Sequence, residues 1–490
     1  MNRWILAFFA GVMSLPSPGT ALGQSDEDGP TVLTLRPAGE PSPALKYTLL
    51  PKRRDLVPGN AAVFYHRALL MLQQQRNAER YEARRMGKEQ SEIAEIGLSD
   101  WINGPIDAIP RQEAQALLDR YASILREVEL GVLRRDCDWG FDNRPETIEL
   151  LLPEVQESRS LARLVSLRAR MAILEGNTED AVHWLRTGYA MARHVSEGSS
   201  LVQAFVGIVI AGVMSNDLTE LIQAKGTPSL YWALANLPGP MIELDEAIEG
   251  ERSLVERMFP DLLELDGPAW SAERGRIFLD SLAEQLQGWT GSAPSDQGSM
   301  ALFLTGLIAR NYPEAKRELV ESGRDEAEVE AMPAIQVVGI LAWRDYVALS
   351  DDVYKWVSLP AREANRRIDA TYSYRTIEEK LARPGLSLFL LVSPALNSVL
   401  MAQTQVDRRL AALRCVEAIR LYAEAHDGRF PPSLEAIEEV PTPLDPATGE
   451  PFGYEVEGDE GDEAALTAPP IPGGPDIPAY RINYRLRMAD

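Results

Sequence analysis

The stretch Ser158–Val195, SRSLARLVSLRARMAILEGNTEDAVHWLRTGYAMARHV, decides the fold class of this 490-residue chain. Its apolar residues recur at helical spacing on both sides of a turn over 175–177 that contains a glycine. We therefore predict one helix that ends at Leu174 and a second that begins at Thr178. Thr178 suits an N-cap, because the two acids after it complement the helix dipole. Small residues let antiparallel helices approach closely, and the stretch provides three of them: Ala169, Ala181 and Gly188.

Helical periodicity extends from Asn60 to about Asn397, so we expect a mainly α fold built from helical hairpins. Two apolar stretches lie inside this region, at 201–214 and 386–402. Both are shorter than the roughly 18 to 20 residues that cross a bilayer as a helix. We interpret them as buried core helices rather than membrane spans.

The last 90 or so residues change character. A helix over 398–427 ends at Gly428, since glycine commonly terminates helices. Three alternating segments follow, and the last of them places its apolar residues on one face and its arginines on the other. One buried and one solvated face is typical of antiparallel sheets. We predict one long helix packed on a three-stranded antiparallel sheet, with strands within 451–457, 464–469 and 479–488.

These patterns predict four parts. Residues 1–23 form a signal peptide, and 24–58 form an N-terminal extension. The extension carries two segments with period-two alternation, TVLTLRP and ALKYTLL, which predict a small β-hairpin. Residues 59–397 form a helical domain, and 398–490 form the α+β module.

The N-terminal segment predicts where the protein goes. Arg3 precedes an apolar run from Trp4 to Leu15, and small residues follow, as in a secretory signal peptide cut after Ala21 or Gly23. The apolar run is short for a membrane span, although an uncleaved signal anchor is the alternative. We expect an exported protein, periplasmic or extracellular, without a stable membrane span beyond the signal segment.

Acidic residues outnumber basic ones by 73 to 49, which gives a net charge of −24. Nucleic acid and anionic membrane surfaces are bound through Lys and Arg clusters, so we expect neither as a partner. Cations, basic proteins or simple solubility fit this charge. From Glu435 to Glu463 the chain carries eleven acids and no Lys or Arg.

Flexible carboxylates in this acidic segment could bind calcium through oxygen. The candidate ligands lie between two predicted strands and are Asp459, Glu460, Asp462 and Glu463. The spacing of an EF-hand is absent, and an ordinary solvated turn is the alternative. No other cofactor is indicated by the sequence.

Nucleophiles and metal ligands are few. The two cysteines, Cys137 and Cys415, exclude a multi-cysteine metal centre, and they could either pair or remain buried thiols. His183 and His194 would lie about 16 Å apart on one helix, too far to share a metal. The other histidines are His66 and His426. The motifs HExxH, GxSxG, GxGxxG and the Walker loop are absent from the sequence.

Carboxylates are plentiful along the stretch MIELDEAIEGER. A glycosidase could draw an acid and a nucleophile from such a set, but solvated helix surfaces carry similar rows. The members are Glu243, Asp245, Glu246, Glu249 and Glu251.

The segment LRCVEAIRLYAEAHDGRFPPSLEAI…PLDPATGEPFGYEVEG resembles the globular half of type II secretion pseudopilins. In that family a long helix leads through a G-R-Y/F-P turn to a D-P-x-x-G-x-P-x-x-Y strand, and some members bind calcium in the loop after it. The chain differs from that family because hundreds of helical residues precede the module. The matching positions are Gly428, Arg429, Phe430, Pro431, Asp445, Pro446, Gly449, Pro451 and Tyr454.

Two further resemblances concern the rest of the chain. The stretch 158–195 resembles a tetratricopeptide hairpin, without a second copy at regular spacing. The segments ALKYTLLP…GNAAVFYHRALL, CDWGFD, LYWALANLPGP and EAMPAIQVV resemble a family of uncharacterised exported proteins from planctomycete-type bacteria. This resemblance implies a bacterial exported protein and no particular chemistry.

The sequence thus favours an exported helical binding or scaffolding protein of the periplasm or cell envelope, with a protein as its partner. It favours a non-enzymatic role. A carboxylate-dependent hydrolase and a pseudopilin-like secretion component are the alternatives.

Overall fold

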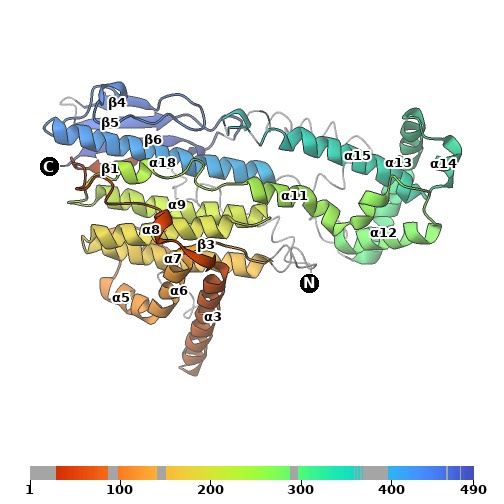
Figure 1. The fold of residues 1–490 in the computed structure, drawn as a ribbon, viewed down its shortest axis with the longest axis horizontal. Coiled ribbons are helices and arrows are strands. Elements are labelled where there is room, and N and C mark those ends of the chain that lie inside the picture. Colours follow the sequence, from red (N-terminus) through yellow and green to blue (C-terminus); the bar gives the residue numbers. More distant parts are fainter. Residues whose placement is uncertain are drawn as a thin grey trace. The chain divides into compact units, whose positions relative to one another are not determined.

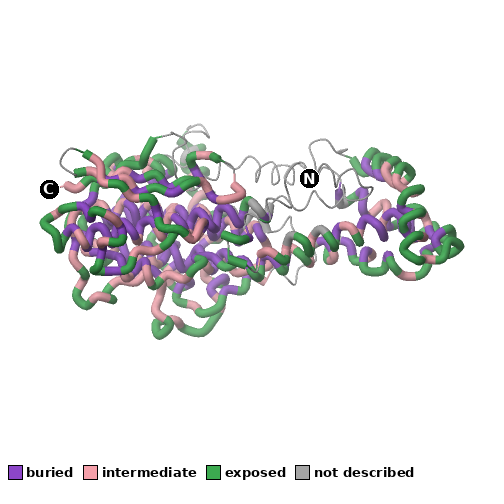
Figure 2. The backbone as a smooth tube through the Cα atoms, turned by 90° about the horizontal axis from the view of Figure 1, so that it is seen from above, coloured by how far each residue is buried: buried purple, intermediate pink, exposed green. Residues whose placement is uncertain are grey.

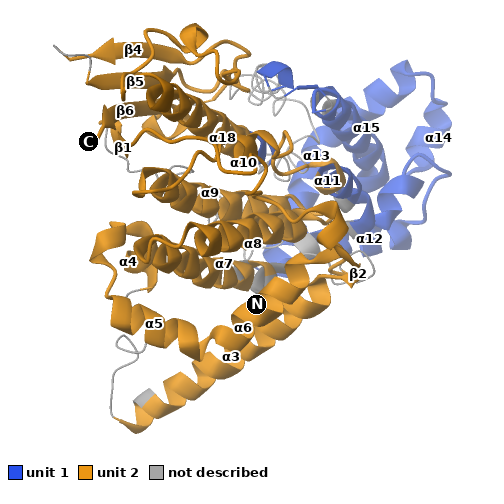
Figure 3. Ribbon diagram, turned by 60° about the vertical axis from the view of Figure 1, so that its left-hand side comes forward, with its two compact units in different colours: residues 1–17, 248–400 blue, residues 18–247, 401–490 orange. Residues whose placement is uncertain are grey.

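The computed structural model describes residues 29–86, 98–140, 151–286, 296–357, 359–360, 362–364, 367, 395–458, 462–474 and 476–489. They belong to two compact units, coloured separately in Figure 3. The core unit takes the described parts of Pro18–Ala247 and Met401–Asp490, and the inserted unit takes those of Ile248–Leu400. This division differs from the boundaries predicted from the sequence, because the helices before Ile248 cluster with the C-terminal module.

Helices make up most of the core unit. Figures 1 and 3 show them stacked in layers, with α18 against the sheet, then α9, then α8 and α7. The helices are α3 (Ala62–Arg85), α4 (Leu98–Asn103), α5 (Arg111–Arg120), α6 (Ala122–Val132), α7 (Leu151–Leu174), α8 (Thr178–Ser196), α9 (Leu201–Gln223), α10 (Tyr231–Ala235) and α18 (Ala395–Ala425). The mainly α fold is confirmed.

The helical hairpin forms with the predicted ends, Leu174 and Thr178. The predicted N-cap is one residue wrong: Asn177 precedes the helix, and its side chain accepts the hydrogen bond from the Asp180 N–H. Gly188 allows α8 to approach α9 rather than α7, because a Cβ at this position would lie 1.9 Å from the sulfur of Met214 on α9. The likeness to a tetratricopeptide repeat stays a prediction.

Helix α9 contains the first of the two apolar stretches. By length and composition it is the one described helix that could cross a membrane, and 78% of its most apolar window is buried inside the structure. It packs against α7 and α8, as a core helix does. Residues 386–394 of the second apolar stretch lie outside the described residues.

The main sheet has four strands in the order β1-β6-β5-β4. The last three strands pair antiparallel as predicted, but β1 adds to β6 in parallel, so the sheet is mixed. Strand β6 alternates buried and more exposed residues along its length, which confirms the predicted two-faced pattern. The strands are β1 (Thr31–Leu35), β4 (Gly453–Glu457), β5 (Glu463–Ala468) and β6 (Ile482–Met488).

The predicted N-terminal hairpin is wrong. Residues 44–50 form no strand, and β1 pairs with β6, more than 400 residues away in sequence. The alternation of β1 does bury Leu33 and Leu35, at 1% and 0% exposure. Period-two alternation identifies a strand and its buried face but not its partner, which explains the error.

A second, two-stranded sheet joins β2 (Val57–Asn60) to β3 (Arg134–Asp136) in parallel. Asn60 ends β2 and caps α3, because its side-chain oxygen accepts from the Ala62 N–H at 2.9 Å. The same side chain pairs with the backbone of Asp138 through both its oxygen and its amide nitrogen. One asparagine therefore fixes the start of α3 beside the end of β3.

The inserted unit has its own apolar core around Trp270 and Phe278, whose rings meet edge to face at 5.4 Å. Gln336 is fully buried there, and its side chain bonds the backbone at Leu265, Pro268 and Trp270. The helices are α12 (Ala272–Leu286), α13 (Gln297–Glu321), α14 (Glu326–Ala331) and α15 (Ala334–Tyr354), and α11 (Asp245–Met258) enters the unit from the core unit.

We expect Leu35→Ala to lower the free energy of unfolding of the core unit by about 2 to 4 kcal/mol, because it removes a fully buried side chain. Val32→Ala on the exposed face of the same strand is the control, and it should change stability by less than about 0.5 kcal/mol. Urea unfolding measures both. Equal effects of the two substitutions would contradict the placement of Leu35 on the buried face of β1.

Candidate functional site

Helix α18 is the central element of the C-terminal module, and most of its described residues belong to the buried class that Figure 2 draws in purple. It carries two arginines with almost no exposed surface, Arg408 at 0% and Arg420 at 1%. Burying a guanidinium without partners would cost several kcal/mol. The partners of these two side chains therefore determine what the module can do.

Arg408 forms four hydrogen bonds to three residues. Its Nε and Nη2 donate to the two carboxylate oxygens of Asp445, both at 2.9 Å. Nη1 donates to the Tyr480 carbonyl at 2.7 Å, and Nη2 also donates to the Pro469 carbonyl at 2.6 Å. A bidentate pair fixes orientation as well as charge. Arg408 thus ties α18 to the segments on either side of the β5–β6 connection.

The segment LDPATGEP, which matches the pseudopilin pattern, forms the turn that presents Asp445. The Asp445 carboxylate accepts from the Ala447 N–H at 2.9 Å, and its carbonyl accepts from the Gly449 N–H at 2.7 Å. Gly449 has a φ of 77°, where a residue with a side chain would be strained. The motif therefore serves as a turn that binds an arginine.

Arg420 ties α18 to the N-terminal part of the chain. It donates to the Arg36 carbonyl at 2.9 Å, to the Thr227 carbonyl at 2.7 Å and to the Glu417 carboxylate at 2.6 Å. The second oxygen of Glu417 accepts from the Leu230 N–H at 2.9 Å. The charge pair is thus fully hydrogen-bonded, which is the condition for keeping it buried.

The turn after α18 supports the edge of the sheet. The Tyr422 and His426 rings stack with centroids 3.7 Å apart, and the His426 Nδ1–H donates to the Tyr422 carbonyl. The helix ends at Ala425, two residues before the predicted end, and Asp427 and Gly428 after it both take a positive φ, of 54° and 81°. Beyond it, the Pro431 carbonyl accepts from the Tyr454 hydroxyl at 3.0 Å, which anchors β4 to this turn.

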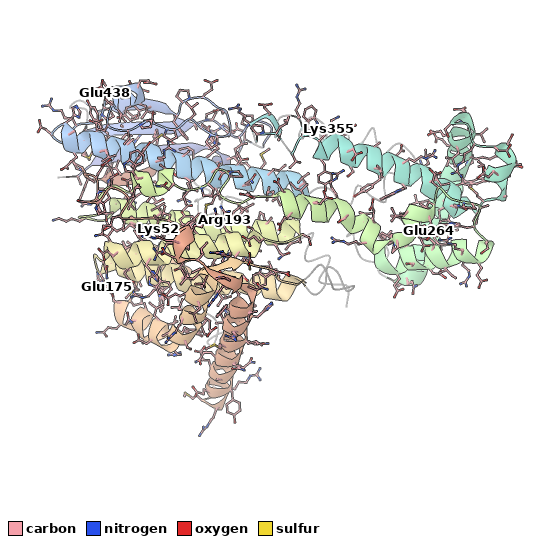
Figure 4. The ribbon with its side chains drawn as sticks, in the orientation of Figure 1. Lys52, Glu175, Arg193, Glu264, Lys355 and Glu438 are labelled. Atoms are coloured by element: carbon pink, nitrogen blue, oxygen red, sulfur yellow. The ribbon has the colours of Figure 1, made fainter. Side chains whose placement is uncertain are left out.

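Exposed carboxylates lie on β4 and in the segments that precede and follow it in sequence. Asp445 is the buried exception in the acidic segment, while most of the other described acids there are exposed. Figure 4 places Glu438 near the β4 end of the core unit. The exposed members are Glu435, Glu438, Glu439, Glu450, Glu455 and Asp462. This acidic surface, held on a frame of buried ion pairs, is our candidate functional site.

The calcium candidates fall in this surface. Asp459 and Glu460 lie outside the described residues, and Asp462 is exposed. Glu463 faces cations already, with Arg487 at 2.7 Å and Arg485 at 3.7 Å. Among the described residues, no group of three or more His, Cys, Asp or Glu side chains is arranged to hold a metal ion. The calcium site stays a prediction.

His194 and His66 both pack in the cluster of Tyr65 and Trp139, whereas His183 lies in a different place. The His194 Nδ1 lies 2.8 Å from the Tyr65 hydroxyl, and burial lowers the pKa of His194 to about 4. Trp139 stacks on Tyr65 and donates its indole N–H to the His194 carbonyl. His183 lies 2.7 Å from Glu129 and also bonds Arg186, and His66 packs edge-on against Trp139.

Both cysteines are free and buried. Burial raises the pKa of each thiol, to about 12 for Cys415. A thiol with a raised pKa is a weak nucleophile at neutral pH. Of the two alternatives that the sequence left open, the structure contains the buried thiols.

The five carboxylates of the stretch MIELDEAIEGER differ in burial and in their neighbours. Glu243 lies 3.8 Å from Arg193, and Glu249 lies 3.9 Å from Arg252. Burial raises the pKa of Glu251 to about 7, while Asp245 and Glu246 are exposed. The hydrolase stays an alternative predicted from the sequence.

Comparison with known proteins gives no relatives. No family model, no curated protein and no solved structure matches this chain. The resemblances to pseudopilins and to planctomycete-type exported proteins therefore stay predictions.

Sequence reasoning missed the two buried arginines and Glu417. The sequence gives no clear signal for them: α18 carries seven charged residues, at 407, 408, 409, 414, 417, 420 and 424, and their spacing does not separate the buried ones from the rest. Asp445 did stand out as a pattern position, but its partner lies 37 residues upstream. Only the folded chain brings the two together.

We expect Arg408→Met to lower the free energy of unfolding by about 3 to 5 kcal/mol, because it leaves the buried Asp445 carboxylate without its cation. Arg481→Met, which removes an exposed ion pair with Asp476, is the control and should cost at most about 1 kcal/mol. Urea unfolding of the full chain measures both. A similar cost for the two variants would contradict the role of Arg408.

Asp407 should make stability depend on pH. Its carboxylate accepts from the Met241 N–H at 2.8 Å, and burial raises its pKa from 3.8 to about 7. The folded state therefore holds a proton that the unfolded state releases, and its stability falls as the pH rises from about 4 to 7. Between pH 5 and pH 8 we expect the wild type to lose about 2 kcal/mol relative to Asp407→Asn. Urea unfolding at a series of pH values measures this, and the prediction is refuted if the free energy of unfolding depends on pH in the same way for the wild type and for Asp407→Asn.

Proposed function

We propose that this chain is an exported binding or scaffolding protein of the bacterial periplasm or cell envelope, and that its partner is a protein. The observation that supports the proposal is the acidic surface around β4, presented on a frame fixed by buried ion pairs. The signal-like N-terminal segment supports the export. That segment lies outside the described residues, so the support comes from the sequence alone.

The frame favours binding because it is already ordered. Arg408 and Arg420 fix α18 to four backbone carbonyls, so the surface beside α18 need not be organised when a partner arrives. A preorganised surface loses less conformational entropy on binding. The acids supply long-range attraction for a cationic partner, which raises the association rate at low salt.

Several described side chains that could act as acids, bases or metal ligands have structural contacts instead. Tyr65, Trp139 and His194 pack together in the core, and His183 pairs with Glu129. The buried carboxylates Asp445 and Glu417 neutralise arginines. These uses favour a protein that holds and presents surfaces.

The test uses the chain from Gln24 onward as tagged bait in periplasmic and envelope extracts of its source bacterium. The control is a triple charge reversal of Glu438, Glu450 and Glu455 to Lys, checked for an unchanged unfolding curve. We expect at least one protein to be enriched about tenfold on the wild type over the control, and to elute between 50 and 300 mM salt. An identical set of proteins on both baits would overturn the proposal.

A further inference from the structure

The two edge strands of the main sheet, β1 and β4, have different surroundings. At the β1 edge, the Gln223 side chain accepts from the Thr34 N–H at 2.9 Å, and the Gln223 carbonyl accepts from Arg36 at 2.8 Å. Helix α9 thus covers that edge. At the β4 edge, no described residue outside the sheet forms a hydrogen bond with the backbone of Gly453–Glu457. Figures 1 and 3 show β4 as the outermost strand of the sheet.

Strand β4 is also regular and firmly supported. Its five residues pair with β5 in unbroken register, without a bulge. Phe452 before it is buried, and the Tyr454 hydroxyl bonds the Pro431 carbonyl. Exposed edges are usually blunted by bulges, prolines, charged side chains or shortness, and β4 lacks a bulge and a proline but is five residues long and carries Glu455 and Glu457. The strand is therefore a preformed template for one more strand, and its two carboxylates restrict which strand can be added.

The charged residues of β4 indicate which kind of segment could bind at its open edge. Glu455, the middle residue of the strand, is exposed on the face away from α18, and its cross-strand neighbour is Ala465. No described residue forms an ion pair with Glu455, whereas Glu457 has Arg485 at 3.7 Å. Glu450, just before the strand, is exposed as well. A strand added beside β4 would meet unneutralised carboxylates.

A second copy of this chain is a poor occupant. Antiparallel pairing of two β4 strands about a two-fold axis would place the middle residues, Glu455 of each copy, beside one another. Like charges directly opposite each other destabilise a strand pair. A partner with Lys or Arg at the corresponding position would gain from the same carboxylate. The edge thus disfavours self-pairing and favours a basic segment.

We propose that the open edge of β4 binds an extended segment of a partner protein that carries Lys or Arg at alternate positions. Main-chain hydrogen bonds to Gly453–Glu457 supply affinity, as in other cases of strand addition. Alternation places the basic residues on the face of Glu455 and the residues between them on the face of Tyr454 and Val456. This inference rests on the proposed function and names the chemistry of its partner.

The test measures binding of a fluorescein-labelled peptide of seven residues, Lys-Val-Lys-Val-Lys-Val-Lys, to the full chain by fluorescence anisotropy. Two peptide controls isolate the two contributions. N-methylation of the three valines removes their backbone donors without changing the charge, and N-methylation of the lysines does the same for the opposite edge of the peptide. A Glu-for-Lys peptide reverses the charge.

The protein variants are Glu455→Lys and Glu455→Gln, with Glu175→Lys as the matched control. Glu175 is an exposed acid in the turn between α7 and α8, far from the sheet in Figure 4. We expect Glu455→Lys to weaken binding at least tenfold and Glu455→Gln about threefold, with Glu175→Lys unchanged. Unfolding curves of all three confirm that they are folded.

Backbone pairing predicts that one of the two N-methylated peptides binds at least tenfold more weakly than the parent, and that the Glu peptide does not bind. Equal affinity of both N-methylated peptides would show attraction by charge alone and overturn the proposal. So would an unchanged affinity for Glu455→Lys, or no binding at 1 mM peptide. A partner from the extract experiment that still binds Glu455→Lys would refute the β4 edge while leaving the binding function intact.

Discussion

Two arginine side chains on one helix hold the core unit together. Arg408 and Arg420 are twelve residues apart on α18, which separates them by about 18 Å along the helix and turns them toward different faces. Each carries five donors in a planar fork, and each finds a carboxylate and two backbone carbonyls. The cost of burying their charges is offset only when all these acceptors are in place, so the segments that supply them must assemble on α18 together.

This requirement explains why segments distant in sequence share one unit. Arg420 holds the carbonyls of Arg36 and Thr227, and Arg408 holds those of Pro469 and Tyr480. The strand before Arg36 then pairs with β6 in the sheet. Closing so long a loop costs entropy, but the cost grows only slowly with loop length. Burial of Leu33 and Leu35 opposes it, so the chain can leave the core unit, form the inserted unit and return.

Local signals in the sequence predicted local structure well. The glycine turn at 175–177 placed the ends of two helices, and the alternation over 482–488 identified β6 and its buried face. Long-range pairings were beyond such signals. Nothing near β1 indicates that its partner is β6, and Arg408 resembles any charged helix residue until Asp445 is brought against it. The acidic segment could be recognised from its composition alone. That β4 lies within it as an open edge strand became known only from the strand order of the sheet.

The interior also explains why the net charge matters at the surface. Two arginines buried in the core unit each bond a buried carboxylate, in the pairs Arg408–Asp445 and Arg420–Glu417. These pairs cancel, so they contribute nothing to the charge of −24, and the excess acid must lie on other, mostly solvated, side chains. Salt screens such charges beyond about 8 Å under physiological conditions. Net charge can therefore attract a cationic partner, but only contacts within a few ångströms, such as those along an open strand, can determine which one stays bound.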